Sequence, residues 1–277
     1  MEDNGNQAFR MFTIPLDPAR AVLRGIMERI FRIEVTGSEH IPRDGGGLII
    51  SNHTDLIDVP VQAVNSPRRI VYFGKAELFE PDADIKNFLF KEGSLFNLLP
   101  GPMLWKPLLE KILSFYADAM KSQMHEWGGR PIIRNYRGES ARDAVEYYRE
   151  LEDYMVGLIG QGELVSLYPE GTRTETGVMG PFKALAAKLA IRAKVPIIPT
   201  GITGSFGFFT PQNILSGRIF KAKITYNIGK PIPPSEFPGG DEKKAAKELT
   251  AELEKQVYAL TLHPERRGRA RGKTRKL

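Results

Sequence analysis

Short apolar runs and segments of helical periodicity alternate along most of the chain. Strands are predicted at 31–37, 47–52, 69–73, 163–168 and 195–202, and a run of alternating character follows at 219–228. Helices are predicted from about residue 55, from about residue 140, and over 182–193 and 241–262. Strands and helices that alternate in this way predict an α/β fold, with a mostly parallel sheet flanked by helices.

Residues 18–33 predict a short amphipathic helix near the start of the chain. Four arginines oppose a single glutamate there, and one stripe collects Leu23, Ile26, Met27 and Ile30. A basic amphipathic helix can dock among lipid headgroups. Packing on the body of the protein is an equally open alternative. We therefore treat residues 1–33 as a candidate membrane-associating segment.

Residues 85–127 do not fit the alternation and form an apolar, helical insertion. Pro107 could open a helix, because proline is well tolerated in a first turn. One face of that helix would then carry Leu104, Leu108, Ile112, Tyr116 and Met120. This stripe predicts a core helix first, while a cover over a lipid groove and a membrane-facing helix are the alternatives.

The chain has 277 residues and no cysteine, which excludes disulfides, thiol nucleophiles and cysteine-held metals. Its net charge of +6 belongs to the end of the chain, because 264–277 hold seven basic residues and one acidic residue while the rest is balanced. We predict a disordered basic tail over 263–277, suited to an anionic membrane surface or to nucleic acid. A plain solvated terminus is the alternative.

No segment is predicted to span a membrane. The longest uncharged run, 195–217, contains three prolines and several glycines, which would break a helix. The first residues are polar and show no secretory leader. If the protein meets a membrane, we expect it to lie on one face of it.

The first candidate site follows the strand at 47–52, where Asn52, His53, Asp55 and Asp58 stand at its carboxyl end. His53 and Asp58 are five residues apart, which would turn them away from each other on a straight helix. They can meet only if His53 lies in the turn before the helix and points back. The carboxylate would then fix the imidazole tautomer and leave the other nitrogen as a general base. The alternative is a helix cap made by Asp55 beside an incidental histidine.

The second candidate site follows the strand at 163–168 and consists of Pro169, Glu170, Gly171, Thr172 and Arg173. Glycine lets the backbone approach a ligand closely, and Arg173 could grip a phosphate with two hydrogen bonds. Thr172 and the loop amides could donate to the same phosphate. An exposed turn with a Glu170–Arg173 ion pair is the alternative. Because both loops end strands, they could open on one crevice.

Six short segments together carry a resemblance to a known family. They are NHTDLID at 52–58, GKAEL at 74–78, GGRPIIR at 128–134, YPEGTR at 168–173, PFKALAAKLA at 181–190 and VPIIP at 195–199. In this order, over roughly residues 30–235, they resemble the glycerolipid acyltransferases, best known as 1-acylglycerol-3-phosphate (lysophosphatidic acid) acyltransferases. The resemblance implies a glycerolphosphate acyltransferase-like α/β domain, which we expect over 34–262.

The resemblance also implies a reaction. His53 would take the proton of an acceptor hydroxyl as that oxygen attacks an acyl thioester, and Asp58 would orient His53. Glu170 would hold its loop or touch the glycerol. The acceptor's phosphate would be held by Gly171, Thr172 and Arg173, with added positive charge from Lys75 and Arg134. The co-substrate would be acyl-CoA or acyl carrier protein, with no cofactor and no metal.

The chain departs from the family pattern at three places. Asp55 stands where the family often has serine, and it could compete with Asp58 for His53. Leu185 replaces a frequent glycine. Lys75 and Arg134 are separated by about twice the usual spacing, and the surplus lies in the insertion at 85–127. These departures affect the identity of the acceptor and acyl chain more than the reaction type.

We therefore expect an O-acyltransferase of phospholipid biosynthesis that acts on 1-acylglycerol 3-phosphate or a related lysophospholipid. It would bind the cytoplasmic side of an anionic membrane without spanning it. One alternative is the same chemistry on glycerol 3-phosphate, a glycolipid or another lysolipid. Another is a non-catalytic protein that binds anionic lipid or nucleic acid, with nucleic acid the less favoured partner.

Overall fold

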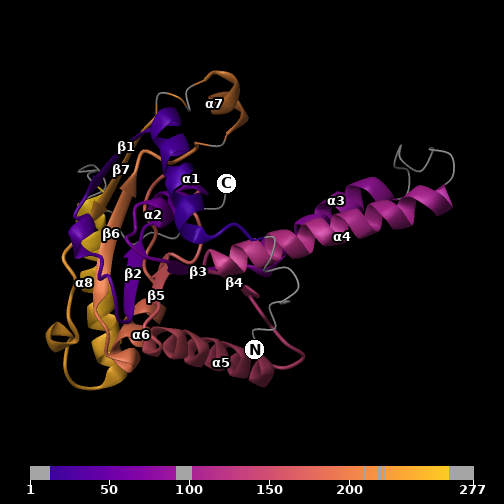
Figure 1. Cartoon of the computed structure of the whole chain (residues 1–277). Helices are drawn as coiled ribbons and strands as arrows, with labels where there is room; N and C mark the ends of the chain where they lie inside the picture. The colour runs from indigo at the N-terminus through magenta and orange to yellow at the C-terminus, as the bar shows by residue number, and fades with distance from the viewer. Residues whose placement is uncertain (1–12, 92–101, 209, 218–219, 221, 262–277) are drawn as a thin grey trace. The chain divides into compact units, whose positions relative to one another are not determined.

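The computed structural model describes residues 13–91, 102–208, 210–217, 220 and 222–261 (Figure 1). The chain divides into two compact units. The larger unit consists of Arg20–Ile70 and Gly138–Leu277, and the smaller consists of Met1–Ala19 and Val71–Arg137. The tail predicted at 263–277 and residues 1–12 of the N-terminal segment lie outside the described residues.

The larger unit contains a five-stranded arrangement in the order β1-β7-β6-β2-β5. Its strands are β1 (Arg32–Thr36), β2 (Gly47–Ser51), β5 (Leu164–Leu167), β6 (Ile197–Thr203) and β7 (Lys223–Ile228). Neighbouring strands are parallel except β6 and β7, which are antiparallel. Ile49 of β2 lies opposite Ser166 of β5 and Ile198 of β6, so these three strands end at the same edge. The prediction of a mostly parallel sheet flanked by helices is confirmed.

Strands β2 and β6 are buried on both faces of the sheet. Leu48, Ile49 and Ile50 of β2 are completely buried, as are Ile197 and Ile198 of β6. Apolar residues in succession are what a strand needs when helices cover both of its faces. The helices of this unit include α2 (Asp58–Val64), α5 (Ala141–Gly160), α6 (Leu185–Ala193), α7 (Pro211–Leu215) and α8 (Glu242–Leu260). Helix α6 packs on α8 and β2, and α8 runs beside β6 (Figure 1).

Helix α5 begins where the sequence predicts. The Ser140 hydroxyl accepts a hydrogen bond from the Asp143 N–H, and the Asp143 carboxylate accepts one from the Ser140 N–H, which completes a capping box. The Ser140 donors hold the pKa of the Asp143 carboxyl below its ordinary value. The cap thus marks the helix start in both sequence and structure.

Helix α1 (Leu16–Ile30) uses two of its arginines to bind the body. Arg20 Nη1 donates to the Ser66 carbonyl at 2.9 Å, and Arg24 Nε donates to the Val64 carbonyl at 2.8 Å. These carbonyls lie at the C-terminal end of α2, where positive charge is favourable. The contacts support the packing alternative for this part of the N-terminal segment.

The smaller unit contains the parallel pair β3 (Ile70–Lys75) and β4 (Gly129–Ile132) and the helices α3 (Pro81–Phe90) and α4 (Pro102–Glu126). The expectation that Pro107 opens the helix is wrong, because α4 begins at Pro102 and Pro107 lies inside it. Pro102 already supplies the preset φ angle that favours a helix start. Among the described helices, none has the length and hydrophobicity that a membrane crossing requires.

The predicted core stripe of α4 is also wrong. Leu108, Ile112 and Tyr116 are 61%, 55% and 44% exposed, whereas Leu113 and Ala117 on another side are buried. The small Ala117 lies on the buried side of the helix, and small side chains favour close packing. The side chain of Leu104 lies outside the described residues. In the part of α4 that the structure describes, the stripe is therefore a surface feature.

Candidate active site

The side chain of Asn52 continues the sheet past the end of β2. Its Nδ2 donates to the Ile202 carbonyl at 2.8 Å, and its Oδ1 accepts from the Ile202 N–H at 2.8 Å. This reciprocal pair joins β2 to β6 one residue beyond the last strand position of β2, Ser51. The next residue, His53, therefore leaves the sheet from a fixed point.

His53 lies in the turn before α2, and Asp58 is the first residue of that helix. A hydrogen bond of 2.9 Å joins His53 Nδ1 to Asp58 Oδ2. The imidazole points back toward the helix start, as their spacing of five residues requires. The Asp58 side chain is 0% exposed and that of His53 is 11% exposed. The pair is thus nearly enclosed without being sealed from solvent.

Several donors surround the buried Asp58 carboxylate. Oδ2 also accepts from the Thr54 N–H at 2.6 Å and the Asp55 N–H at 2.9 Å, while Oδ1 accepts from Ser205 Oγ at 2.8 Å. Hydrogen bonds of this kind offset the cost of burying a charge. They also leave the carboxylate as an acceptor for the Nδ1–H of His53.

The imidazole of His53 stacks on the ring of Tyr168, which follows β5. The ring centroids are 4.0 Å apart and the planes meet at 19°. Stacking and the Asp58 hydrogen bond together fix the ring. Among the described residues, His53 Nε2 has no hydrogen-bond partner. This nitrogen can therefore accept a proton from a bound molecule.

Glu170 ties the second loop to the first. Its Oε1 accepts from the His53 N–H at 2.8 Å, and its Oε2 accepts from the Gly180 N–H. Both carboxylate oxygens of Glu170 therefore accept hydrogen bonds from backbone N–H groups of other segments, which gives Glu170 a structural role beyond the predicted turn. Its buried carboxylate holds the loop's position.

The rest of the second loop is exposed beside this tie. The Gly171 N–H closes a turn on the Tyr168 carbonyl at 2.9 Å, and Gly171 has a φ of 76°, which favours glycine. Thr172 and Arg173 are exposed. The Thr174 N–H donates to the His53 carbonyl at 2.9 Å. The structure thus brings the Glu170–Arg173 segment against the His53 turn.

A further cation lies beside this loop. A Cβ added to Gly171 would be 2.6 Å from Lys183 Nζ, and the Lys183 N–H donates to the Pro169 carbonyl at 2.9 Å. Lys183 is exposed. Two exposed cations, Arg173 in the loop and Lys183 beside it, therefore lie near backbone N–H groups that suit an anion.

Asp55 does not compete for His53. Its Oδ1 accepts from the Leu56 N–H at 2.6 Å and its Oδ2 accepts from the Phe208 N–H at 2.9 Å. Both Asp55 oxygens thus accept from backbone N–H groups, while Asp58 binds His53. Within the ranges that the structure describes, no group of three or more His, Asp or Glu side chains is arranged to hold a metal ion.

Lys75 and Arg134 belong to the smaller unit. Lys75 ends β3 opposite Ile132 of β4, and Arg134 follows β4 two residues later. Parallel pairing brings both residues to the carboxyl end of these two strands, and both are exposed. This pair is a basic feature of the smaller unit.

Sequence reasoning missed Thr54, Tyr168, Lys183 and Ser205 as parts of the site. Tyr168 and Ser205 follow β5 and β6, so the rule that sites form at the carboxyl ends of parallel strands could have found them. Thr54 and Lys183 stand inside recognised segments, and nothing in their pattern separates them from neighbouring polar residues.

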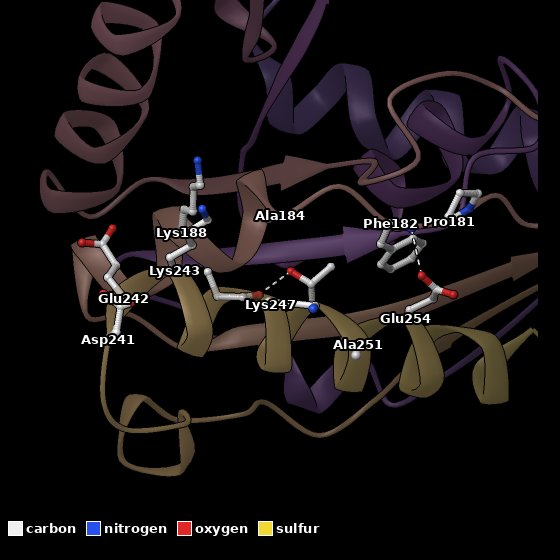
Figure 2. Close-up of a pocket in the computed structure, with 12 residues that line it drawn as sticks. Pro181, Phe182, Ala184, Lys188, Asp241, Glu242, Lys243, Lys247, Ala251 and Glu254 are labelled. Carbon is white, nitrogen blue, oxygen red and sulfur yellow. Dashed lines mark hydrogen bonds between the residues drawn. The ribbon is translucent and has the colours of Figure 1, made fainter. Parts of the chain in front are cut away.

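A groove of about 750 Å³ lies in the larger unit, between the 181–188 segment and helix α8 (Figure 2). The Phe182 N–H donates to Glu254 at 2.9 Å across it. Its charged lining is mixed and consists of Lys188, Lys243, Lys247, Asp241, Glu242 and Glu254. Neither His53 nor any residue of the Glu170–Arg173 loop lines it, so it is separate from the candidate active site.

Several known proteins are similar to this chain. The chain is similar to a 1-acyl-sn-glycerol-3-phosphate acyltransferase of Bacillus subtilis, with 26% identity over 82% of this chain and 87% of the relative. It is 34% identical to a probable 1-acyl-sn-glycerol-3-phosphate acyltransferase of Mycoplasma pneumoniae over 37% of this chain. The human alpha form is 26% identical over 73% of this chain. The matches span 40% of the Mycoplasma relative and 55% of the human one.

The crystal structure of the 1-acyl-sn-glycerophosphate (LPA) acyltransferase PlsC from Thermotoga maritima is similar in fold. The TM-score is 0.50 with 20% sequence identity, over 92% of this chain and 88% of that one. The Acyltransferase family profile matches residues 32–97 and 102–203. This match covers more than half of the chain, which therefore belongs to the acyltransferase family.

Proposed function

We propose that this protein is an O-acyltransferase that moves a fatty acyl group from acyl-CoA or acyl carrier protein to the hydroxyl of 1-acylglycerol 3-phosphate. The observation that carries the proposal is the His53–Asp58 pair, fixed by buried donors beside a loop with exposed cations. The names of relatives from Bacillus subtilis and human point to the same acceptor. Phospholipid biosynthesis is the process in which such a product is used.

His53 acts as the general base. The acceptor oxygen attacks the thioester carbonyl carbon while its proton passes to His53 Nε2. The carbon–sulfur bond then breaks, and the leaving sulfur takes the proton back from the imidazolium. Asp58 accepts the Nδ1–H hydrogen bond throughout and stabilises the positive ring. Two substrates held together in this way need no acyl-enzyme.

The exposed second loop holds the acceptor's phosphate. Arg173 presents a planar guanidinium that matches two phosphate oxygens, and the backbone at Gly171 and Thr172 allows close approach. Lys183 adds a second charge beside Gly171. The family resemblance assigns Lys75 and Arg134 to the same phosphate. Their contribution stays a prediction that substitution of each would test.

We place the enzyme on the cytoplasmic face of an anionic membrane, where a lysophospholipid acceptor resides. The exposed stripe of α4 supports this placement. Four apolar side chains of this one helix are each more than 40% exposed, namely those of Leu108, Ile112, Phe115 and Tyr116. A group of exposed apolar side chains is typical of a surface that contacts lipid or another protein. We assign the stripe to the lipid surface.

The test is a panel of acceptors offered with one acyl-CoA and, separately, one acyl carrier protein, with products identified by mass spectrometry. The panel contains lysophosphatidate, glycerol 3-phosphate, a lysoglycolipid and other lysophospholipids. Acylation of lysophosphatidate in preference to the others is expected. Preference for another acceptor would reassign the substrate, and lipid binding without any product from either donor would overturn the enzymatic proposal.

A further inference from the structure

The segment that follows β6 reaches the buried carboxylate of the candidate active site. Gly204 has a φ of 89°, and a Cβ at this position would collide with the Lys223 carbonyl of β7. Glycine therefore lets the chain turn tightly against β7 as β6 ends. The turn delivers Ser205, a completely buried residue, to Asp58.

The two oxygens of Asp58 accept hydrogen bonds from two parts of the chain that are far apart in sequence. Residues 53–55, before α2, supply the donors to Oδ2, whereas Oδ1 lies 2.8 Å from the hydroxyl of Ser205, 147 residues away, and 3.2 Å from the hydroxyl of Thr54. A carboxylate that is hydrogen-bonded at only one oxygen can rotate about its Cβ–Cγ bond. One held at both is fixed in plane and direction, and so is the imidazole that it binds.

The hydroxyl hydrogens follow from the acceptors available. Thr54 Oγ1 lies next to Ser205 Oγ and 3.2 Å from Asp58 Oδ1. The carboxylate is the stronger acceptor, so Ser205 donates its single proton to Asp58. Thr54 then donates to the Ser205 oxygen or to Asp58. Both hydroxyls thus serve the same carboxylate.

A second contact fastens the same segment. The Phe208 N–H donates to Asp55 Oδ2 at 2.9 Å, and the ring of Phe208 packs edge-on against Phe31 at 4.7 Å. The 204–208 segment is therefore attached to the His53 turn at both Ser205 and Phe208. This arrangement gives Asp55 a structural reason to be a carboxylate, because a carboxylate can accept from Phe208 and Leu56 together.

We propose that Ser205 is a positioning residue of the His53–Asp58 pair, which acts by fixing the Asp58 carboxylate and through it the Nδ1–H of His53. The catalytic consequence rests on the proposed function of His53. The hydrogen-bonding consequence does not, since it concerns only the resting protein.

The experiment compares wild type with Ser205→Ala and Ser205→Thr in the full-length protein. Ser216→Ala is the matched control, because Ser216 is an exposed serine whose hydroxyl is directed at the Asn213 carbonyl. The first readout is the proton NMR signal of His53 Nδ1–H, assigned by its loss in His53→Ala. The second is kcat and KM for lysophosphatidate.

Ser205→Ala is expected to shift or broaden the His53 Nδ1–H signal and to lower kcat about 10- to 100-fold, the scale of one hydrogen bond to a charged group. The KM should change less than about twofold, since Ser205 touches no substrate. Ser205→Thr retains the hydroxyl and should recover the signal and most of kcat. Ser216→Ala should behave as wild type.

The NMR signal keeps this test separate from the proposed function. If wild type acylates no lysolipid but Ser205→Ala still alters the His53 signal, the positioning role stands and the reaction is reassigned. An unchanged signal and unchanged kcat in folded Ser205→Ala would overturn the proposal. If Ser205→Ala does not fold, the Thr variant decides, because wild-type signal and turnover support the hydroxyl's role and their loss in a folded protein contradicts it.

Discussion

The main-chain N–H of His53 donates a hydrogen bond of 2.8 Å to Oε1 of Glu170, a residue 117 positions later. The other oxygen of Glu170 accepts from Gly180, and the Thr174 N–H returns a hydrogen bond to the His53 carbonyl. The two loops that carry the candidate chemistry are therefore one structural element. Their mutual position does not depend on a bound substrate.

Glu170→Ala is expected to destabilise the protein by about 1–3 kcal/mol for each buried N–H left without an acceptor. Glu170→Gln retains one acceptor oxygen and should cost less. Urea unfolding of both variants measures the difference. Equal stability of wild type and Glu170→Ala would show that the carboxylate does not hold the two loops.

Arg173→Ala is expected to raise KM for lysophosphatidate about tenfold or more, because a charge-assisted, two-point contact with phosphate is lost. Arg173→Lys keeps the charge but not the planar geometry, and it should recover only part of the affinity. The matched comparison is monoacylglycerol, which lacks the phosphate. An equal rise in KM for both acceptors would contradict a role in phosphate binding.

Gly171→Ala is expected to reduce both stability and turnover. An alanine at a φ of 76° is strained by about 1–2 kcal/mol, and its Cβ would displace Lys183 Nζ. Gly157→Ala is the control, since Gly157 lies inside α5 with nothing within 4 Å of an added Cβ. That variant should be as stable as wild type or more stable. Thermal melts and acylation rates of both variants test this, and only Gly171→Ala should lose stability and turnover.

Ile112→Glu in α4 is expected to weaken binding to uncharged phosphatidylcholine vesicles about tenfold or more, because an exposed apolar side chain that enters the lipid is lost. Lys111→Gln makes the same change in charge at an adjacent exposed position and should bind as wild type does. Vesicle flotation measures both. Equal binding by the Ile112 variant and wild type would remove the stripe from the membrane contact.

Much of the larger unit could be predicted because its strands have simple patterns. The apolar run Gly47–Ser51 between turn signals predicts a strand, and Ser140 with Asp143 predicts the start of α5. β4 was missed because Gly129 and Pro131 are poor strand formers, and its parallel pairing with β3 supplies what its sequence lacks.

The insertion was harder to predict for a physical reason. An apolar stripe indicates that a helix face will be covered, but it does not say by what. Leu113 and Ala117 are covered by protein, while Leu108 and Ile112 remain exposed. A single sequence contains no signal that separates these two faces.

The candidate site was predictable only where it is local. His53 and Asp58 are five residues apart, so geometry alone required the histidine to precede the helix. Ser205 reaches the same carboxylate from another strand, and Tyr168 stacks on the imidazole from a third. Such contacts depend on strand order, which hydrophobic pattern does not determine.

The most direct test of the account measures the release of free thiol from acyl-CoA in the presence of lysophosphatidate, for wild type, His53→Ala and His40→Ala. His40 is a suitable control because it contacts the Ile228 carbonyl, away from the Asp58 carboxylate. Loss of the general base should slow His53→Ala by about 10²- to 10⁴-fold, while His40→Ala retains the wild-type rate. Full activity in a folded His53→Ala protein would contradict the account.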